Sequence, residues 1–161
     1  MDASDQYAPL RLKNQLCYPL YLCSKEIIRR YTPILNRLNL TYTQYIVMMY
    51  FWEEGQSSEK RLSRALRLDP GTLTPLLRKL ENKGYITRTR SASDGRSLVL
   101  ALTDAGLRLR DAALPVPAEM GACIGLDAGD AAQLCHLITK ILNRLKKENE
   151  NELPGDHEGN L

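Results

Sequence analysis

The sequence lacks the features of a membrane-spanning or exported protein. No apolar run approaches the ~20 residues that a membrane helix needs. The first six residues, Met1 to Gln6, contain neither a basic start nor an apolar core, so they do not form a signal peptide. We therefore expect a cytoplasmic protein without a membrane partner, whose four cysteines are thiols rather than a structural disulfide framework.

Glycine, proline and histidine are also scarce. Ten glycines and eight prolines among 161 residues are too few for a low-complexity chain, and 43% hydrophobic with 25% charged residues is typical of a globular domain. The length suits one domain. With two histidines, His136 and His157, and no Cys-x-x-Cys or His-x-x-x-His spacing, we expect no metal and no other cofactor.

The net charge of +3 conceals an uneven distribution. Residues 148–161 hold five acidic residues and no lysine or arginine. Removing these five acids leaves +8 on residues 1–147, a charge that attracts polyanions such as nucleic acid. A solvated basic surface accounts for this charge equally well. The acidic tail, 148–161, is expected to be disordered.

The spacing of apolar residues predicts a mainly helical chain with one β-hairpin. Pro19 conflicts with a regular first helix, which must either kink there or start later. Thr41 begins a string with capping-box spacing, and Asp69 followed by Pro70 is typical of a helix start. The expected order is helix 10–38, helix after Thr41, helix 58–66, helix 69–84, strands 85–90 and 98–102, helix after Thr103 interrupted at Pro115 and Pro117, and helix 130–147.

Three short helices followed by a two-stranded hairpin is the order of a winged helix-turn-helix. We therefore predict a single domain that is mainly α with a small antiparallel β-hairpin, with the winged helix-turn-helix at 40–103. The flanking helices, at 10–38 and 104–147, have apolar faces that so small a module cannot cover. We expect them to be dimerisation helices of a homodimer. A plain helical bundle with an incidental hairpin is the alternative.

Four strings of residues carry a family resemblance. They are Leu12-Lys13-Asn14-Gln15-Leu16-Cys17, Leu40-Thr41-Tyr42-Thr43-Gln44-Tyr45, Leu68-Asp69-Pro70-Gly71-Thr72-Leu73-Thr74-Pro75-Leu76-Leu77 and Asp94-Gly95-Arg96-Ser97. In order and spacing, over residues 10–147, the chain resembles the MarR family of bacterial repressors. Within that family it resembles the branch that responds to organic hydroperoxides, often called OhrR. The resemblance implies a homodimeric winged-helix repressor that leaves DNA when a cysteine is oxidised.

The helix after Asp69 is the candidate recognition helix for double-stranded DNA. Its leucines are expected to face the interior, and the stretch 69–96 carries six basic residues against three acidic ones. At the hairpin tip, Arg96 suits a narrow minor groove and Asp94 can orient it. A dimer of this kind should read an inverted-repeat operator. The expected DNA-binding residues are Thr72, Thr74, Arg78, Lys79, Arg88, Arg90, Asp94 and Arg96.

Cys17 is the candidate redox sensor, because a peroxide is attacked by a thiolate, which becomes a sulfenic acid. Tyrosine hydroxyls can stabilise that thiolate, and seven of the eight tyrosines lie within the first 50 residues. Tyr31 is 14 positions after Cys17, about 21 Å along a straight helix, so the two cannot touch within one helix. The resemblance implies that Tyr31 and Tyr42 of the partner subunit donate to Cys17. Tyr21, one turn from Cys17, is expected to line the same pocket.

The other cysteines decide the fate of the sulfenic acid. A Cys17–Cys23 disulfide is excluded on a regular helix, because six residues separate the two by about 9 Å along the axis and by a large rotation. The resemblance implies either an intersubunit disulfide with a cysteine of the C-terminal dimerisation region, for which we favour Cys123, or a mixed disulfide with a small thiol. Cys135 lies among leucines and is expected to be an inert buried thiol.

Two functions of other kinds compete with the redox repressor. The first is a MarR-type repressor that a phenolic or other small aromatic ligand releases from DNA, which the Asn14-Gln15-Leu16-Cys17 string argues against. The second is an enzyme, a thiol peroxidase, for which the sequence offers no recycling partner. We therefore expect a regulator and not an enzyme.

Overall fold

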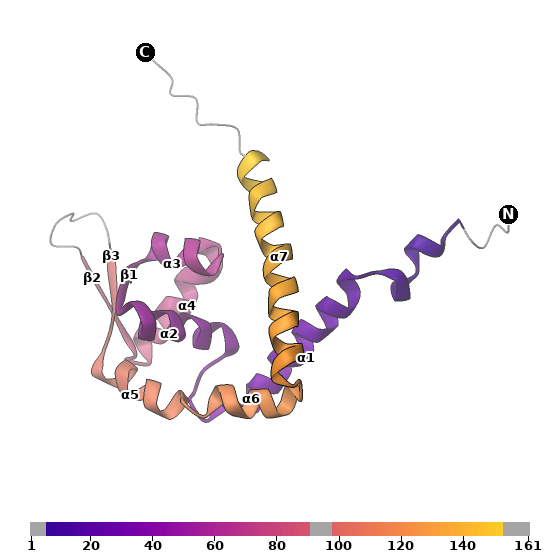
Figure 1. Ribbon diagram of the computed structural model, residues 1–161. Coiled ribbons are helices and arrows are strands. Elements are labelled where there is room, and N and C mark those ends of the chain that lie inside the picture. The colour runs from indigo at the N-terminus through magenta and orange to yellow at the C-terminus, as the bar shows by residue number, and fades with distance from the viewer. Residues whose placement is uncertain (1–5, 91–97, 153–161) are drawn as a thin grey trace, which may run out of the picture. The chain divides into compact units, whose positions relative to one another are not determined.

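The computed structural model describes residues 6–90 and 98–152, with the backbone alone for 147–152. It divides into two units, residues 1–123 and 124–161. Two short 3-10 turns, Ala8–Leu10 and Leu12–Asn14, precede the main elements (Figure 1). These elements are α1 (Cys17–Asn36), α2 (Tyr42–Glu54), β1 (Gln56–Ser58), α3 (Glu59–Leu66), α4 (Pro70–Asn82), β2 (Ile86–Arg90), β3 (Leu98–Leu102), α5 (Asp104–Ala113), α6 (Val116–Ile124) and α7 (Ala128–Glu152).

The predicted helix starts of the central module are confirmed by their caps. Thr41 and Gln44 form both hydrogen bonds of a capping box at the start of α2. Asp69 caps α4, with Pro70 at its first helical position. Such caps satisfy backbone N–H groups that the first helical turn leaves without a partner. The capping residues of α2 and α4 therefore fix where these two helices begin.

The first helix starts later than the predicted range of 10–38. α1 begins at Cys17, so Pro19 falls in its first turn, where a missing N–H costs no helical hydrogen bond. This resolves the conflict that Pro19 raised, and the residues before Cys17 are 3-10 turns rather than α-helix. Pro33 lies inside α1 and does not end it, since the helix continues to Asn36.

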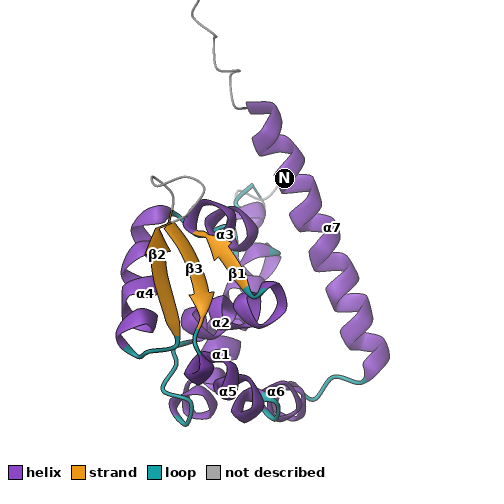
Figure 2. Ribbon diagram, turned by 90° about the vertical axis from the view of Figure 1, so that its left-hand side faces the viewer, coloured by secondary structure: helices purple, strands orange, loops and turns teal. Residues whose placement is uncertain are grey.

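The sheet has three strands, one more than the predicted hairpin. β3 pairs antiparallel with β2 and, on its other side, with β1, giving the order β1-β3-β2 (Figure 2). Ser57 of β1 lies opposite Leu100, and Arg88 of β2 lies opposite the same residue from the other side. β1 consists of three polar residues, Gln-Ser-Ser, too few to show an alternating pattern.

The core lies between the helices of the module and the sheet. The inward residues of α4 are the predicted leucines, and all four are buried together with Phe51 of α2. α2 and α5 are joined by a hydrogen bond of 2.9 Å from Trp52 Nε1 to the carbonyl oxygen of Gly106. Gly106 also sits so close to the Tyr85 carbonyl oxygen that a Cβ at this position would clash with it. The start of α5 is therefore closely packed against α2 and the start of β2.

Two breaks separate the C-terminal helices. α5 ends at Ala113, two residues before Pro115, and Pro117 occupies the first turn of α6, as the predicted interruption requires. α6 ends before Gly125, whose φ of +69° belongs to the left-handed region that favours glycine. α7 begins two residues before the predicted start and continues to Glu152, five residues into the segment assigned to the tail.

Large apolar side chains remain exposed on both flanking regions. They include Leu12, Leu16 and Leu20 near the N-terminus, and Leu134, Leu137, Ile141 and Leu145 on α7. Cys135 is exposed in the single chain, whereas a buried thiol was predicted. Within residues 6–90 and 98–152, no helix is both long and apolar enough to cross a membrane.

Candidate DNA-binding surface and thiol site

The candidate recognition helix α4 begins with a closed network of polar contacts. The Asp69 carboxylate accepts hydrogen bonds from the backbone N–H of Thr72 at 2.9 Å and from its hydroxyl at 2.7 Å. These bonds hold the pKa of Asp69 below its ordinary value, because they stabilise the charged form. Thr72 is exposed, and its hydroxyl oxygen keeps acceptor capacity for a second partner. Arg78 and Lys79 are exposed on later turns.

Glu59 joins three elements at the base of this surface. Its carboxylate, at the start of α3, accepts a hydrogen bond from the Thr74 hydroxyl of α4 and lies 3.6 Å from Arg88 Nη2 of β2. The Arg88 side chain is only 14% exposed. Of the predicted DNA contacts, Thr74 and Arg88 are therefore engaged within the protein, whereas Arg90, at the end of β2, is exposed. Asp94 and Arg96 lie outside the described residues.

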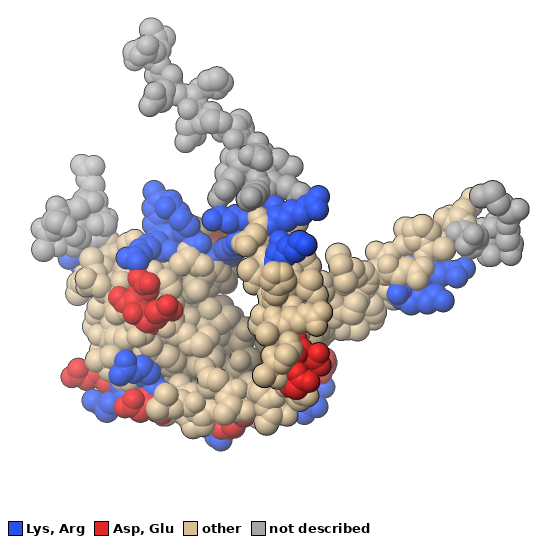
Figure 3. Space-filling view, in the orientation of Figure 1, with Lys and Arg blue, Asp and Glu red and all other residues tan. Residues whose placement is uncertain are grey.

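A basic patch that the sequence reasoning did not single out covers α3. Figure 3 shows Lys and Arg side chains gathered over this helix. The exposed members are Lys60, Arg61, Arg64 and, just after the helix, Arg67. The sequence did hold a signal for this patch, because basic residues recur along a helix in which one leucine, Leu62, is buried.

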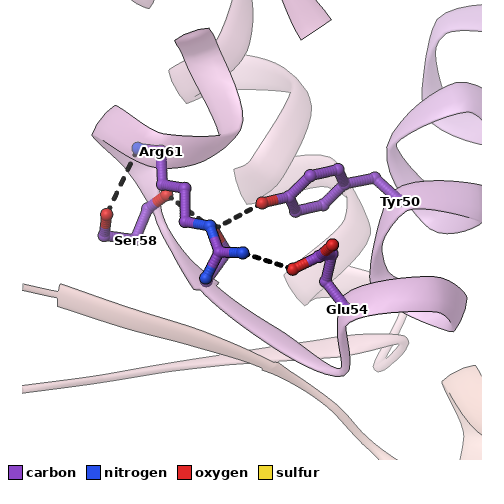
Figure 4. Close-up of polar contacts among 5 residues, drawn as sticks. Tyr50, Glu54, Ser58 and Arg61 are labelled. Atoms are coloured by element: carbon purple, nitrogen blue, oxygen red, sulfur yellow. Dashed lines mark hydrogen bonds and ion pairs between the residues drawn. The ribbon is translucent and has the colours of Figure 1, made fainter. Parts of the chain in front are cut away.

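Arg61 is the member of this patch that is already paired. Its guanidinium donates to the Glu54 carboxylate, and its backbone N–H donates to the Ser58 hydroxyl, which caps α3 (Figure 4). Tyr50 lies beside this group, with its hydroxyl 3.1 Å from that of Ser57. These contacts fix the segment between α2 and α3. The positive charge that the patch presents to solvent is therefore carried mainly by its other members.

The candidate sensor Cys17 is the first residue of α1 and is exposed. Tyr31 lies on the same continuous helix, 14 residues later, so about 21 Å of axial rise separates the two residues within one subunit. Tyr21 is 59% exposed, with Lys25 Nζ placed 5.3 Å from the centre of its ring. The structure therefore does not bring Cys17 and Tyr31 together within the chain.

Tyr31 and Tyr42 do meet, from α1 and α2. Their ring centroids are 4.7 Å apart, and Tyr45 joins them with its ring 6.0 Å from that of Tyr31. Burial and the neighbouring Tyr42 raise the pKa of Tyr31. Burial also raises the pKa of Tyr45, together with its neighbours Tyr31 and Tyr42. Both phenols therefore keep the proton that a hydrogen-bond donor needs. Sequence reasoning missed Tyr45, although its spacing of three from Tyr42 places both on one helical face.

The remaining thiols stand apart from this cluster along the chain. Cys123 lies in the last turn of α6 and is exposed, as are Cys23 on α1 and Cys135 on α7. No three His, Cys, Asp or Glu side chains in the described part of the chain are grouped to hold a metal ion.

Comparison with known proteins gives consistent relatives. The family model for the transcriptional regulator SarA/Rot matches residues 29–112. The chain is 37% identical over 148 residues to the organic hydroperoxide resistance transcriptional regulator of Bacillus subtilis (strain 168), covering 90% of this chain and 99% of that protein. Among solved structures, reduced AbfR bound to DNA matches with a TM-score of 0.76 and 30% identity, over 88% of this chain and 97% of AbfR.

A second state of AbfR, which comes from Staphylococcus epidermidis, is also similar. The disulfide-formed structure matches with a TM-score of 0.61 and 31% identity, over 92% of this chain and 99% of that one. These relatives confirm the predicted winged helix-turn-helix fold and the resemblance to the organic-hydroperoxide branch. The family consists of regulators rather than enzymes. The chain is a member of the MarR/SarA family of transcriptional regulators.

Proposed function

We propose that this protein is a homodimeric, DNA-binding repressor that senses organic hydroperoxides through oxidation of Cys17 and then releases an inverted-repeat operator. The observation that carries the proposal is the pair Tyr31 and Tyr42, two phenols that can donate to one sulfur. Because α1 holds Cys17 about 21 Å from Tyr31 of the same subunit, the sulfur that this pair serves comes from the partner subunit. One relative is named for organic hydroperoxide resistance, which supports an organic hydroperoxide as the signal.

Among the described residues, we assign the DNA contacts to predicted side chains that are exposed. Thr72, Arg78 and Lys79 of α4 meet the major groove, with Thr74 held on the same helix by Glu59. Arg90 meets the DNA backbone, and Arg96 enters the minor groove, oriented by Asp94. Arg88, partly buried beside Glu59, positions β2 rather than contacting DNA. The DNA-bound structure of reduced AbfR supports DNA binding by this fold.

The proposed chemistry takes two steps. The Cys17 thiolate attacks the terminal oxygen of the hydroperoxide, an S–O bond forms and the O–O bond breaks. The sulfur is thereby oxidised to sulfenic acid, and the departing alkoxide takes a proton from solvent and leaves as the alcohol. The thiol of Cys123 in the partner subunit then attacks this sulfur, the S–S bond forms and water leaves. Both thiols are exposed, so both are accessible to these reactions. The disulfide-formed structure of AbfR supports the second step.

A non-reducing gel before and after stoichiometric organic hydroperoxide tests both steps. We expect a covalent dimer band from the wild-type protein and from Cys23→Ser, the matched control on the same helix. We expect no band from Cys17→Ser or Cys123→Ser. Operator release, followed by fluorescence anisotropy, should need Cys17 in the same way.

Two other results would change the proposal. A modified Cys17 in the mass spectrum without a dimer band would replace the disulfide with a one-cysteine sensor that ends in a mixed disulfide. An unmodified Cys17 at excess peroxide would overturn redox sensing, and release by a small aromatic ligand would then be the function to test.

A further inference from the structure

A groove runs along the recognition helix on the side that faces the start of α2. Its volume is about 330 Å³. Thr72, Lys79 and Lys83 line it from α4 and its C-terminal cap, and Thr43 lines it from α2. No carboxylate is among its described lining residues. The groove thus carries positive charge, with an apolar part of its lining that includes Pro75 and Leu76, beside the helix proposed to enter DNA.

Lys83 is fixed in this groove rather than free in solvent. Its ammonium donates to Gln44 Oε1 at 2.9 Å and to the carbonyl oxygen of Asn39. A lysine ammonium has three donors, so the third remains for a ligand in the groove. Both acceptors are neutral, and neither offsets the charge.

Lys79 adds a second positive charge one helical turn before Lys83. The pKa of Lys83 is lowered by burial and by this neighbouring charge. Two cations held together without a counter-charge attract an anion, and the Thr43 hydroxyl supplies a further donor from the facing element. A phosphate oxyanion has the charge and the acceptors that this set of donors requires.

The dimensions of DNA indicate where the phosphate comes from. A helix with its side chains is about 10–12 Å wide and the major groove is about 12 Å wide. A helix inserted in the DNA major groove therefore brings both of its sides close to the sugar–phosphate backbones that border that groove. The Lys79–Lys83 groove forms one such flank of α4. We propose that it binds one backbone phosphate of DNA, a site that rests on the proposed DNA-binding function.

The test is the salt dependence of binding to duplex DNA, measured by fluorescence anisotropy with the reduced full-length protein. Each phosphate contact contributes about 0.9 to the slope of log affinity against log salt. We expect Lys79→Gln/Lys83→Gln to lose about 1.8 per bound homodimer, about 0.9 for each subunit, because both lysines of a subunit serve one phosphate. Lys83→Arg should keep the wild-type slope, and so should Lys140→Gln, a matched control on α7. Thermal unfolding by circular dichroism confirms that the variants fold.

The contrary results are distinct. An unchanged slope in the double variant would overturn the site while the proposed function stands. A loss of about 3.6 per homodimer would mean two separate phosphates in each subunit and would overturn the shared site. Inorganic phosphate that perturbs the Lys79 and Lys83 ammonium signals in NMR, with an unchanged DNA slope, would assign the groove to a free anion instead. If the reduced wild-type protein binds no duplex, both this site and the proposed function fail.

Discussion

At the scale of single residues, two arginines of one strand have opposite fates. Arg88 and Arg90 are two positions apart on β2 and share the charge and the strand propensity that a sequence reveals. Only the fold separates them, because Glu59 of α3 comes to lie beside Arg88. The sequence therefore predicted both as DNA contacts, and partial burial distinguishes them.

This difference predicts a matched pair of variants. Arg90→Gln should reduce the salt slope of duplex binding by about 1.8 per homodimer, because each subunit loses an exposed cation that neutralises a phosphate. Arg88→Gln should leave the slope unchanged but lower the free energy of unfolding by about 1 to 3 kcal/mol, because the half-buried Glu59 loses its partner. Anisotropy and urea unfolding measure the two effects. The reverse pattern would show that Arg88 leaves Glu59 for DNA.

At the scale of elements, the cap of α4 gives the recognition helix an acid sensitivity. The pKa of Asp69 is lowered by the hydrogen bonds from Thr72, so the charged cap stabilises the folded state above the ordinary aspartate pKa of 3.8. This stabilisation is lost as the pH falls through the lowered pKa. The difference in urea midpoint between the wild-type protein and Asp69→Ala should therefore be largest above pH 3.8 and shrink below it. Asp69→Asn keeps an acceptor without titrating and should retain most of the cap. A pH-independent difference would contradict the assignment.

The elements also show what a sequence can and cannot predict. Thr41, Ser58, Asp69 and Thr103 mark helix starts because capping is local chemistry, and the leucines of α4 are found by their period. β1 could not be predicted from the sequence, because Gln56–Ser58 forms a strand only by pairing with β3, which lies more than 40 residues further along the chain. The meeting of Tyr31 with Tyr42 depends likewise on how α1 packs against α2.

At the scale of the whole molecule, the proposed sensor is shared between two subunits. Each site takes Cys17 from one subunit and Tyr31 from the other, so a dimer of Cys17→Ser with Tyr31→Phe contains one doubly altered site and one intact site. We expect mixed dimers to react with hydroperoxide at about half the capacity of wild type, whereas Cys17→Ser homodimers are inert and Tyr31→Phe homodimers are slow. Stopped-flow measurement of peroxide loss after subunit exchange checks this. Activity no greater than the average of the two homodimers would place Tyr31 and Cys17 outside a shared site.

Gly106 limits how this sequence can vary. A side chain there would displace the Tyr85 carbonyl, and the carbonyl of Gly106 itself holds the Trp52 indole. By contrast, a Cβ added at Gly121 on α6 meets nothing within 4 Å. Within the chain, a side chain at Gly121 therefore has room, while any side chain at Gly106 forces the backbone to move. Gly106 thus constrains the sequence through the packing of α5 against α2 and the start of β2.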